Sequence, residues 1–382
     1  MNSLRDICDY VVTRTNIIEN YISTENMLPN KGGVCDTLKV PSGGIGTKYQ
    51  VGDILISNIR PYFKKIWQAD CEGACSTDVL CLRANENVDS RFLYYLLTQQ
   101  SFFDYVMSGT KGCKMPRGDK QQIMQWHIHL PSLVEQKKIA GVLSVLDAKI
   151  QVNRSINDNL EQQAQTLYKS WFVDFEPFKD GEFIESELGQ IPEGWQCIPF
   201  SMFVSESKAK TGKIGIKEYS VTNNGIFPRD AKYNKSLSQS STKNKLILYG
   251  DLVFGMSRDI LNWGVMQEEQ GGVSSAYTVY NINSGIVNST YLELFIKSRI
   301  HLFSDLIRPS AREGQGIDKS VLQTKVLLCP PQEVLDTFWP LYNSVTNQIQ
   351  TTTTEINCLG DVRDTLLPKL MSGELKINEI DC

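Results

Sequence analysis

The sequence predicts an α+β protein in which two mixed α/β domains follow one another as a tandem repeat. Two long antiparallel helices are expected to join them as a coiled coil, with an approximate two-fold axis relating the halves. Two observations support this prediction: short motifs recur almost 200 residues apart, and an apolar stripe with heptad spacing follows each copy. A chain of 382 residues also exceeds what one ordinary core needs.

The repeat is clearest in two Gly-Asp turns. The stretches "VGDILISNIR" and "YGDLVFGMSR" begin at Val51 and Tyr249, and their Gly-Asp pairs lie 198 residues apart. Pro131 and Pro330, each after an apolar run, lie 199 residues apart. Because the matches keep one order at a nearly constant offset, they predict a duplication in which each copy covers about half of the chain.

The local elements follow in the same order in each copy. Each Gly-Asp turn is expected to feed a short buried strand. Residues 90–107 and 289–307 have aromatic and apolar faces that predict helices, with Ser90 and Ser289 as N-caps. The stretches "QWHIHLPS" and "KVLLCPP" predict a last strand that proline ends.

A long helix is expected after each copy. In "KKIAGVLSVLDAKIQVN" the apolar residues alternate steps of four and three, and a second stripe repeats the pattern 199 residues later. Either the helices pair through these stripes or each covers its own domain. Pro340 can delay or kink the second helix. The residues predicted to form the helix–helix seam are Ile139, Leu143, Leu146, Ile150, Leu160, Leu167, Val345, Ile349, Ile356, Leu359 and Leu366.

Composition excludes several classes of protein. Hydrophobic residues make up 41% of the chain and charged residues 21%, and no apolar run approaches the roughly 20 residues of a membrane span. Asp6 lies where a signal peptide would be apolar, so we expect a cytoplasmic protein whose ten cysteines are reduced. Cys71, Cys75 and Cys81 fit no common zinc spacing, so no metal site is expected.

Catalytic signatures are missing from the sequence. It has no Asn-Pro-Pro or Asp-Pro-Pro followed by an aromatic residue, which an amino-methyltransferase would use to hold a flipped adenine. It also lacks the G-x-x-x-x-G-K-[ST] pattern that cradles phosphate. The chain itself is therefore expected not to be an enzyme.

Basic and polar residues gather in loops at equivalent places of the two copies. Lys and Arg suit phosphates, and Arg, Asn, Gln and Ser suit base edges, so these loops are candidates for DNA contact, although a solvated surface is the simpler alternative. The predicted DNA-binding residues of the first copy are Ser57, Asn58, Arg60, Tyr62, Lys64, Lys65, Lys111, Lys114, Arg117 and Lys120. Those of the second copy are Ser257, Arg258, Asn262, Trp263, Arg308, Arg312, Gln315 and Lys319.

Several longer stretches match a known family. They are "LPSLVEQKKIAGVLSVLDAKI" (130–150), "TLYKSWFVDFEPF" (166–178), "SELGQIPEGWQ" (186–196) and "LLPKLMSGEL" (366–375), together with the paired "GDIL" and "GDLV" turns. On these residues the chain resembles the specificity subunit of type I restriction-modification systems. The matching stretches cover the expected helices and their flanks, and the duplication extends over nearly the whole chain.

The resemblance implies a domain organisation. Target-recognition domains would occupy residues 1–132 and 176–331, the second with a leading segment 176–195. Residues 133–175 would form the central conserved helix, and residues 332–382 the C-terminal conserved helix and tail.

It also implies a function in host defence. Each recognition domain would read one half of a split sequence in double-stranded DNA. Two methyltransferase subunits would dock on the helical region and methylate adenine with S-adenosylmethionine, which this chain would not bind, and restriction subunits with motor and nuclease activity would complete the complex. The alternatives are a catalytic DNA methyltransferase or nuclease with fused recognition domains, and a coiled-coil adaptor without a DNA role.

Overall fold

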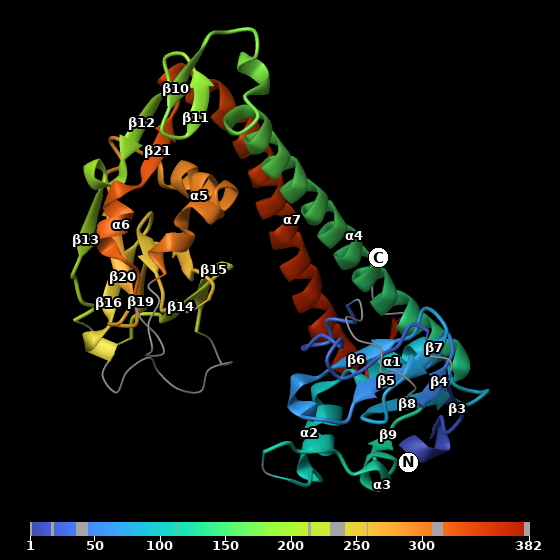
Figure 1. Ribbon diagram of the computed structural model, residues 1–382. Coiled ribbons are helices and arrows are strands. Elements are labelled where there is room, and N and C mark those ends of the chain that lie inside the picture. The colour runs from blue at the N-terminus through green and yellow to red at the C-terminus, as the bar shows by residue number, and fades with distance from the viewer. Residues whose placement is uncertain are drawn as a thin grey trace. The chain divides into compact units, whose positions relative to one another are not determined.

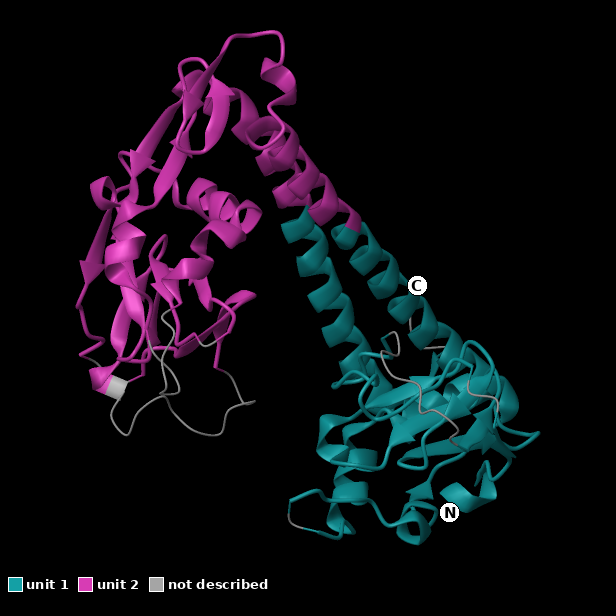
Figure 2. Ribbon diagram, viewed as in Figure 1, with its two compact units in different colours: residues 1–158, 349–382 teal, residues 159–348 magenta. Residues whose placement is uncertain are grey.

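The computed structural model describes residues 2–16, 19–35, 45–112, 114–212, 215–229, 241–257, 259–307 and 316–377 (Figure 1). The chain forms two compact units: unit 1 contains residues 1–158 and 349–382, and unit 2 contains residues 159–348 (Figure 2). The division falls within the two long helices, α4 (Leu133–Phe172) and α7 (Gln332–Ser372). Each unit therefore contains one globular domain and a part of both helices.

The domain of unit 1 is built around a four-stranded antiparallel sheet in the order β2 (Cys8–Tyr10), β8 (Val79–Ala84), β5 (Ile54–Ser57) and β6 (Ile66–Gln68). Helices α1 (Ser90–Leu97), α2 (Gln100–Ser108) and α3 (Lys120–Ile123) follow in the chain. The smaller sheets pair β1 (Asn2–Ser3) with β9 (His127–Ile128), and β4 (Gly46–Tyr49) with β3 (Arg14–Thr15) and β7 (Gly73–Cys75).

Unit 2 repeats this arrangement. Its four-stranded sheet has the order β13 (Val204–Ser207), β20 (Thr278–Ile282), β17 (Leu252–Phe254) and β18 (Trp263–Val265), which is the order of the corresponding strands in unit 1. The shared strand order is what a duplication predicts. The remaining elements are β10 (Phe183–Ser186), β11 (Gly189–Pro192), β12 (Gln196–Pro199), β14 (Tyr219–Thr222), β15 (Gly225–Pro228), β16 (Lys245–Leu248), β19 (Gln270–Val273), β21 (Val326–Cys329), α5 (Ser289–Ser298) and α6 (Lys319–Thr324).

The predicted N-caps of α1 and α5 were wrong by one residue. The Asp89 side chain accepts a hydrogen bond from the Phe92 amide at 2.9 Å, and the Asn288 side chain accepts one from the Thr290 amide at 2.9 Å. Serine therefore occupies the first helical position in both copies. Each long predicted helix also breaks: residues 90–107 divide into α1 and α2, and α5 is followed by a 3-10 helix at Ile300–Leu306.

The two long helices are continuous over 40 and 41 residues. A capping box starts α4, because the Glu135 carboxylate accepts from the Ser132 amide at 3.0 Å and the Ser132 hydroxyl accepts from the Glu135 amide at 3.4 Å. Helix α7 begins at Gln332 and passes through Pro340 without ending. Pro340 is exposed, so the hydrogen bond that it cannot donate is lost on the solvent side.

Both interpretations of the apolar stripes hold, at different positions. In unit 1 the two helices run antiparallel, because Asp147 pairs with Arg363 at 2.7 Å, whereas Asn157, later in α4, bonds the earlier Thr353 at 3.0 Å. At the ends the helices cover the domains. Ile139 and Leu143 belong to the unit 1 core together with Leu367, Leu370 and Met371.

The predicted seam residues are all buried or half-buried. Ile139, Leu143, Ile150 and Leu160 are at most 9% exposed, and the other seven are intermediate. Asn153, at a heptad position between them, is 1% exposed. The outer positions Val145 and Val152 are 68% and 54% exposed, so burial follows the heptad spacing.

Aromatic packing attaches α4 to the domain of unit 2. The Phe172 ring lies 4.6 Å from that of Phe338 in α7 and 5.8 Å from that of Trp195, which ends the "IPEGW" stretch. The Trp195 ring also contacts Phe175 and Phe178, and its side chain is buried. The motif that carried much of the resemblance therefore anchors a helix end. Within the described residues, no helix is long and apolar enough to cross a membrane.

Candidate nucleic-acid interface

A buried aspartate positions the central strand of each domain. Gly52 adopts a φ of +89°, which favours glycine, and the next residue, Asp53, is 1% exposed. Its carboxylate accepts a hydrogen bond from the Gln50 amide at 2.9 Å and two from the Arg83 guanidinium, both at 2.7 Å. This turn sets the start of β5, whose far end leads into the candidate DNA-binding loop.

The structure joins two basic loops of unit 1 that are distant in the sequence. We call them the loop pair: residues 58–65, between β5 and β6, and residues 109–119, before α3. The Arg60 amide donates to the Pro116 carbonyl at 2.8 Å, and the Gly118 amide donates to the Asn58 carbonyl at 3.3 Å. A further backbone bridge links Ile59 with Arg117. The predicted basic residues of this half therefore belong to one continuous surface.

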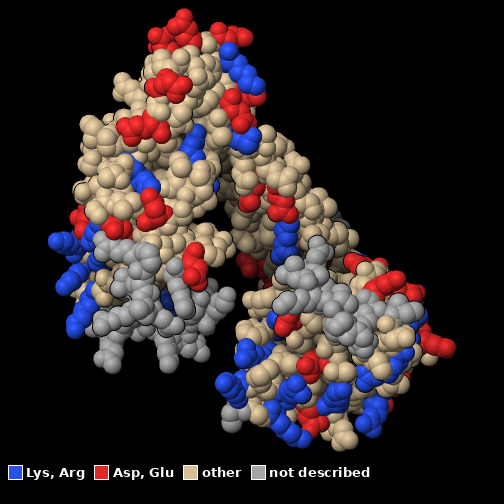
Figure 3. Space-filling view, viewed as in Figure 1, with Lys and Arg blue, Asp and Glu red and all other residues tan. Residues whose placement is uncertain are grey.

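Acidic residues orient part of this surface. The Arg117 guanidinium pairs with the Asp78 carboxylate at 3.1 Å, and the Lys111 amine pairs with the Asp119 carboxylate at 2.7 Å. Asp119 also caps α3, and the hydrogen bonds from Lys111 and from the backbone amides of α3 hold its pKa below the usual range. Lys114 and Lys120 are exposed and form no ion pair with any residue that the structure describes. Figure 3 shows Lys and Arg side chains spread over the lower part of unit 1 in that view.

Three of the residues predicted to bind DNA in this half instead form hydrogen bonds within the protein. The Ser57 hydroxyl is buried and donates to the Ile59 carbonyl at 3.1 Å, the Lys65 amine donates to the Thr24 carbonyl at 2.7 Å, and the Lys64 amine donates to the Gln100 side chain. Burial lowers the pKa of Lys65. These groups are already bonded within the protein and have little capacity left for DNA.

Unsatisfied polar atoms remain where the two loops meet. The Asn58 side-chain oxygen and Arg60 Nε are buried without a hydrogen-bond partner, and Arg60 adopts a left-handed φ of +51°. Tyr62, between them and the strand β6, is 46% exposed.

In the corresponding loop of unit 2, different hydrogen bonds hold the backbone in place. Asn262 donates from its amide to the Ser257 hydroxyl at 2.9 Å and from its side chain to the Met256 carbonyl at 2.7 Å. Trp263 is 4% exposed and lies in the core, which leaves it no face for DNA. Lys319 pairs with Glu206 at 2.5 Å. The predictions for Arg258, Arg308, Arg312 and Gln315 fall outside the described residues.

Sequence reasoning missed the acidic partner of Arg117. Asp78 lies in a loop before β8, and the residue 198 positions later is Ala276, so the repeat does not mark it. Among the described residues, no group of three or more His, Cys, Asp and Glu side chains could hold a metal ion. The loop pair thus offers a basic surface that suits a polyanion.

Comparison with known proteins identifies the class. Residues 8–162 match the family model described as the type I restriction modification DNA specificity domain. The chain is 28% identical over 311 residues to the type I restriction enzyme MjaIX specificity subunit of Methanocaldococcus jannaschii, covering 77% of this chain and 71% of that protein. It is 31% identical over 167 residues to the HindI specificity subunit of Haemophilus influenzae, covering 42% of this chain and 36% of that one.

A crystal structure supports the fold. The S subunit of a type I restriction-modification system from M. genitalium aligns with 97% of this chain and 95% of its own length, at a TM-score of 0.52 and 13% identity. The chain is thus similar to type I restriction-modification specificity subunits, the family that its motifs indicated, and its first part matches their DNA specificity domain. These relatives are named as specificity subunits, and they belong to neither of the alternative classes, catalytic methyltransferase or nuclease and coiled-coil adaptor.

Proposed function

We propose that this chain is a specificity subunit that reads a split target in double-stranded DNA, one half with each domain. The observation that carries the proposal is the loop pair of unit 1: two basic segments about 50 residues apart in the sequence meet at the end of β5 and expose Lys111, Lys114 and Arg117 together. Unit 2 has the same strand order, which supports an equivalent surface there. We propose domain boundaries of 1–132 and 176–331.

The residues that we propose for DNA contact in unit 1 are Asn58, Arg60, Tyr62, Lys111, Lys114, Arg117 and Lys120. Arg117 is oriented by Asp78 and suits a base edge, because a fixed guanidinium can donate two parallel hydrogen bonds. Lys114 and Lys120 suit phosphates, which need charge more than fixed geometry. In unit 2 we propose Arg258, Arg308, Arg312, Gln315 and Lys319.

We further propose the partners of the complex. Two methyltransferase subunits would dock on the helical region and supply S-adenosylmethionine, and restriction subunits would complete the assembly in the cytoplasm. The exposed outer positions Val145, Val152 and Ile156 of α4 support a protein contact on that helix. The mass of the complex assembled with excess methyltransferase subunit tests the stoichiometry, and a complex with a single methyltransferase subunit would contradict it.

DNA binding by the reconstituted methyltransferase complex tests the loop pair. The variant Lys114→Ala/Arg117→Ala should weaken binding and reduce the salt dependence by up to about one per lost phosphate contact. Loss of sequence preference in one half of the target would assign base reading to Arg117. The matched control is Lys48→Ala, an exposed lysine on β4. Unchanged affinity and salt dependence in the double variant would remove the loop pair from the DNA interface.

We also propose that the paired helices set the gap between the half-sites. Four residues inserted near Asn153 add about 6 Å of helix and roughly 40° of rotation beyond one turn. Because one base-pair step is about 3.4 Å, the gap should lengthen by about one or two base pairs while both half-sequences stay the same. Mapping the methylated sequences of the parent and the insertion variant measures this. Changed bases with an unchanged gap would contradict the proposal.

A further inference from the structure

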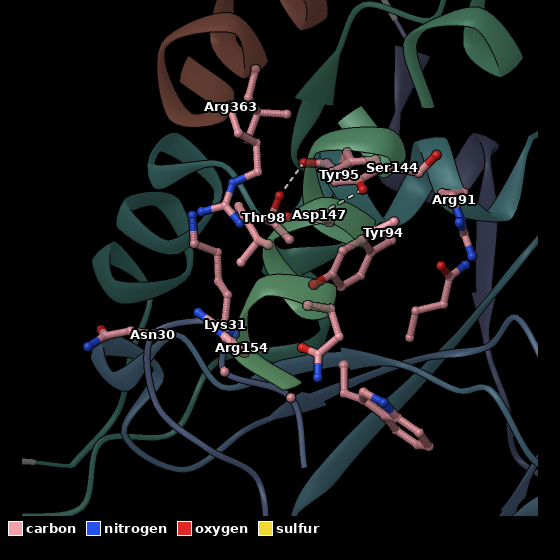
Figure 4. Close-up of a pocket in the computed structure, with 18 residues that line it drawn as sticks. Asn30, Lys31, Arg91, Tyr94, Tyr95, Thr98, Ser144, Asp147, Arg154 and Arg363 are labelled. Carbon is pink, nitrogen blue, oxygen red and sulfur yellow. Dashed lines mark hydrogen bonds and ion pairs between the residues drawn. The ribbon is translucent and has the colours of Figure 1, made fainter. Parts of the chain in front are cut away.

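Unit 1 contains a cavity of about 390 Å³ beside the long helices. Its walls come from three places: residues 30–33, helix α1 with the end of β6, and the facing parts of α4 and α7. Figure 4 shows side chains from these elements converging on one space, with Arg91 on one side and Arg363, Lys31 and Arg154 on the other. A volume of this size suits a small organic ligand.

The cavity has an excess of positive charge. Its lining includes Lys31, Arg91, Arg154 and Arg363 but a single carboxylate, Asp147. Arg363 is paired with Asp147 at 2.7 Å and with Asp364 at 2.9 Å, and Lys31 reaches Asp364 at 3.5 Å. These two cations and two carboxylates balance.

The two remaining cations are not balanced. Arg91 and Arg154 are exposed residues at the edge of the cavity and form no ion pair with any residue in the described part of the chain, so two positive charges face its opening unpaired. Partial burial also lowers the pKa of Lys31, which indicates that charge is poorly solvated at the Lys31 end of the cavity. A ligand carrying about two negative charges would complete this arrangement, as a phosphate monoester does at neutral pH.

Aromatic and amide groups complete the lining. Tyr95 donates its hydroxyl to Asp147 at 2.7 Å, which keeps that carboxylate turned toward Arg363. The ring of Tyr94 lies in the same space, and burial raises its pKa to about 12, so its hydroxyl remains a donor at neutral pH. Trp67 and Gln68 form another part of the wall. Stacking faces and amides beside a phosphate site are the groups that bind a nucleobase.

The duplicated half does not repeat this chemistry. At an offset of 199 residues, Arg91 corresponds to Thr290, Tyr94 to Glu293, and Tyr95 to Leu294. On the long helix Asp147 corresponds to Thr346 and Arg154 to Thr353. The strands, turns and caps are shared by both copies, whereas the cationic lining belongs to the first copy alone. The lining is therefore not a requirement of the fold.

We propose that this cavity binds a small phosphate monoester of the nucleotide class. The phosphate would lie between Arg91 and Arg154, and the base would lie against Tyr94 or Trp67. A phosphodiester of DNA is the other source of the same chemistry. It carries a single charge per phosphate and is less well matched to an excess of two.

Binding of AMP and of inorganic phosphate to the full chain, by titration calorimetry, tests the proposal. AMP should bind more tightly than phosphate, because phosphate lacks the base. Arg91→Ala and Arg154→Ala should each weaken AMP binding by about tenfold, the effect of one charge-assisted hydrogen bond. The control Lys297→Ala, on the corresponding helix of unit 2, should leave AMP binding unchanged.

Three results would overturn the proposal. One is the absence of AMP binding at about 1 mM ligand with a folded protein. Another is equal weakening by Lys297→Ala, which would indicate nonspecific charge. The third is displacement of AMP by duplex DNA together with loss of duplex affinity in Arg91→Ala, which would assign the cavity to a DNA phosphate. The competition with duplex DNA is needed because the cavity adjoins the loop pair: the Lys31 amide donates to the Lys64 carbonyl at 2.9 Å.

Discussion

Each domain buries the aspartate of its Gly-Asp turn, but different side chains donate hydrogen bonds to that carboxylate. In unit 1 the buried Asp53 carboxylate accepts two hydrogen bonds from Arg83, each at 2.7 Å. In unit 2 the equivalent carboxylate, Asp251, accepts one hydrogen bond from the Asn281 side chain at 2.8 Å. Both also accept from the backbone amide three residues earlier. Both copies keep the hydrogen-bonded turn, whereas the cationic partner of the carboxylate in unit 1 is replaced by a neutral amide in unit 2.

This difference shows what each half requires. The bidentate Arg83 guanidinium neutralises Asp53, and its hydrogen bonds with that carboxylate raise the pKa of Arg83. Asparagine satisfies the hydrogen-bonding capacity of Asp251 without neutralising it, so burial raises the pKa of that carboxyl. The backbone hydrogen bond is common to both, which indicates that turn geometry is the shared requirement.

The largest expected effect separates the two partners. Arg83→Ala leaves a buried carboxylate without a cation, and should destabilise unit 1 by about 2–3 kcal/mol, below the usual 3–5 kcal/mol for a broken buried pair because the Arg83 side chain is 41% exposed. Asn281→Ala should destabilise unit 2 by about 1 kcal/mol. Hydrogen exchange of the β5 and β17 amides measures each unit separately. Equal losses of stability in the two units would show that the charge of Arg83 adds nothing to what a neutral hydrogen-bond donor provides.

Alanine at the two turn glycines should have matching effects. Gly52 and Gly250 have φ values of +89° and +84°, so Gly52→Ala and Gly250→Ala should each cost about 1–2 kcal/mol in the free energy of unfolding. The control is Gly141→Ala in α4, where no described atom outside the helix's own nearby backbone lies within 4 Å of an added Cβ, and it should stabilise by about 0.5–1 kcal/mol. Very different costs at the two turns would show that their surroundings differ more than their backbones do.

The helix caps should also be equivalent. Asp89→Ala and Asn288→Ala should each destabilise by about 1 kcal/mol, because each removes the acceptor of the first-turn amides. Ser289→Ala is the control, since serine at the first helical position does not cap α5. Thermal unfolding measures all three. A larger loss for Ser289→Ala than for Asn288→Ala would restore serine as the cap.

The stability of unit 2 should depend on pH through Asp251. Its pKa is raised in the folded state, so folding favours the protonated carboxyl. The contribution is fully present below the unfolded pKa of about 3.9 and is lost as pH rises through the higher folded value. Urea unfolding of the parent and of Asp251→Ala at a series of pH values isolates this dependence. A parent curve parallel to that of the variant would show that the carboxyl titrates normally.

The sequence by itself determined the duplication, the two Gly-Asp turns and the heptad stripes, because these depend on residue spacing along the chain. Pro340 does not delay the start of α7, which begins at Gln332. An exposed proline costs one hydrogen bond, and a 41-residue helix tolerates that loss.

Only the tertiary structure decided which polar residues face outward. Ser57 and Trp263 look like DNA-binding residues in sequence and are buried in the structure, because a loop's side-chain directions depend on what packs against it. The meeting of residues 58–65 with 109–119 arises in the same way. So does the cationic cavity, whose Lys31, Arg91, Arg154 and Arg363 share no sequence motif. Contacts between distant segments depend on how the chain packs, and local periodicity carries no record of them.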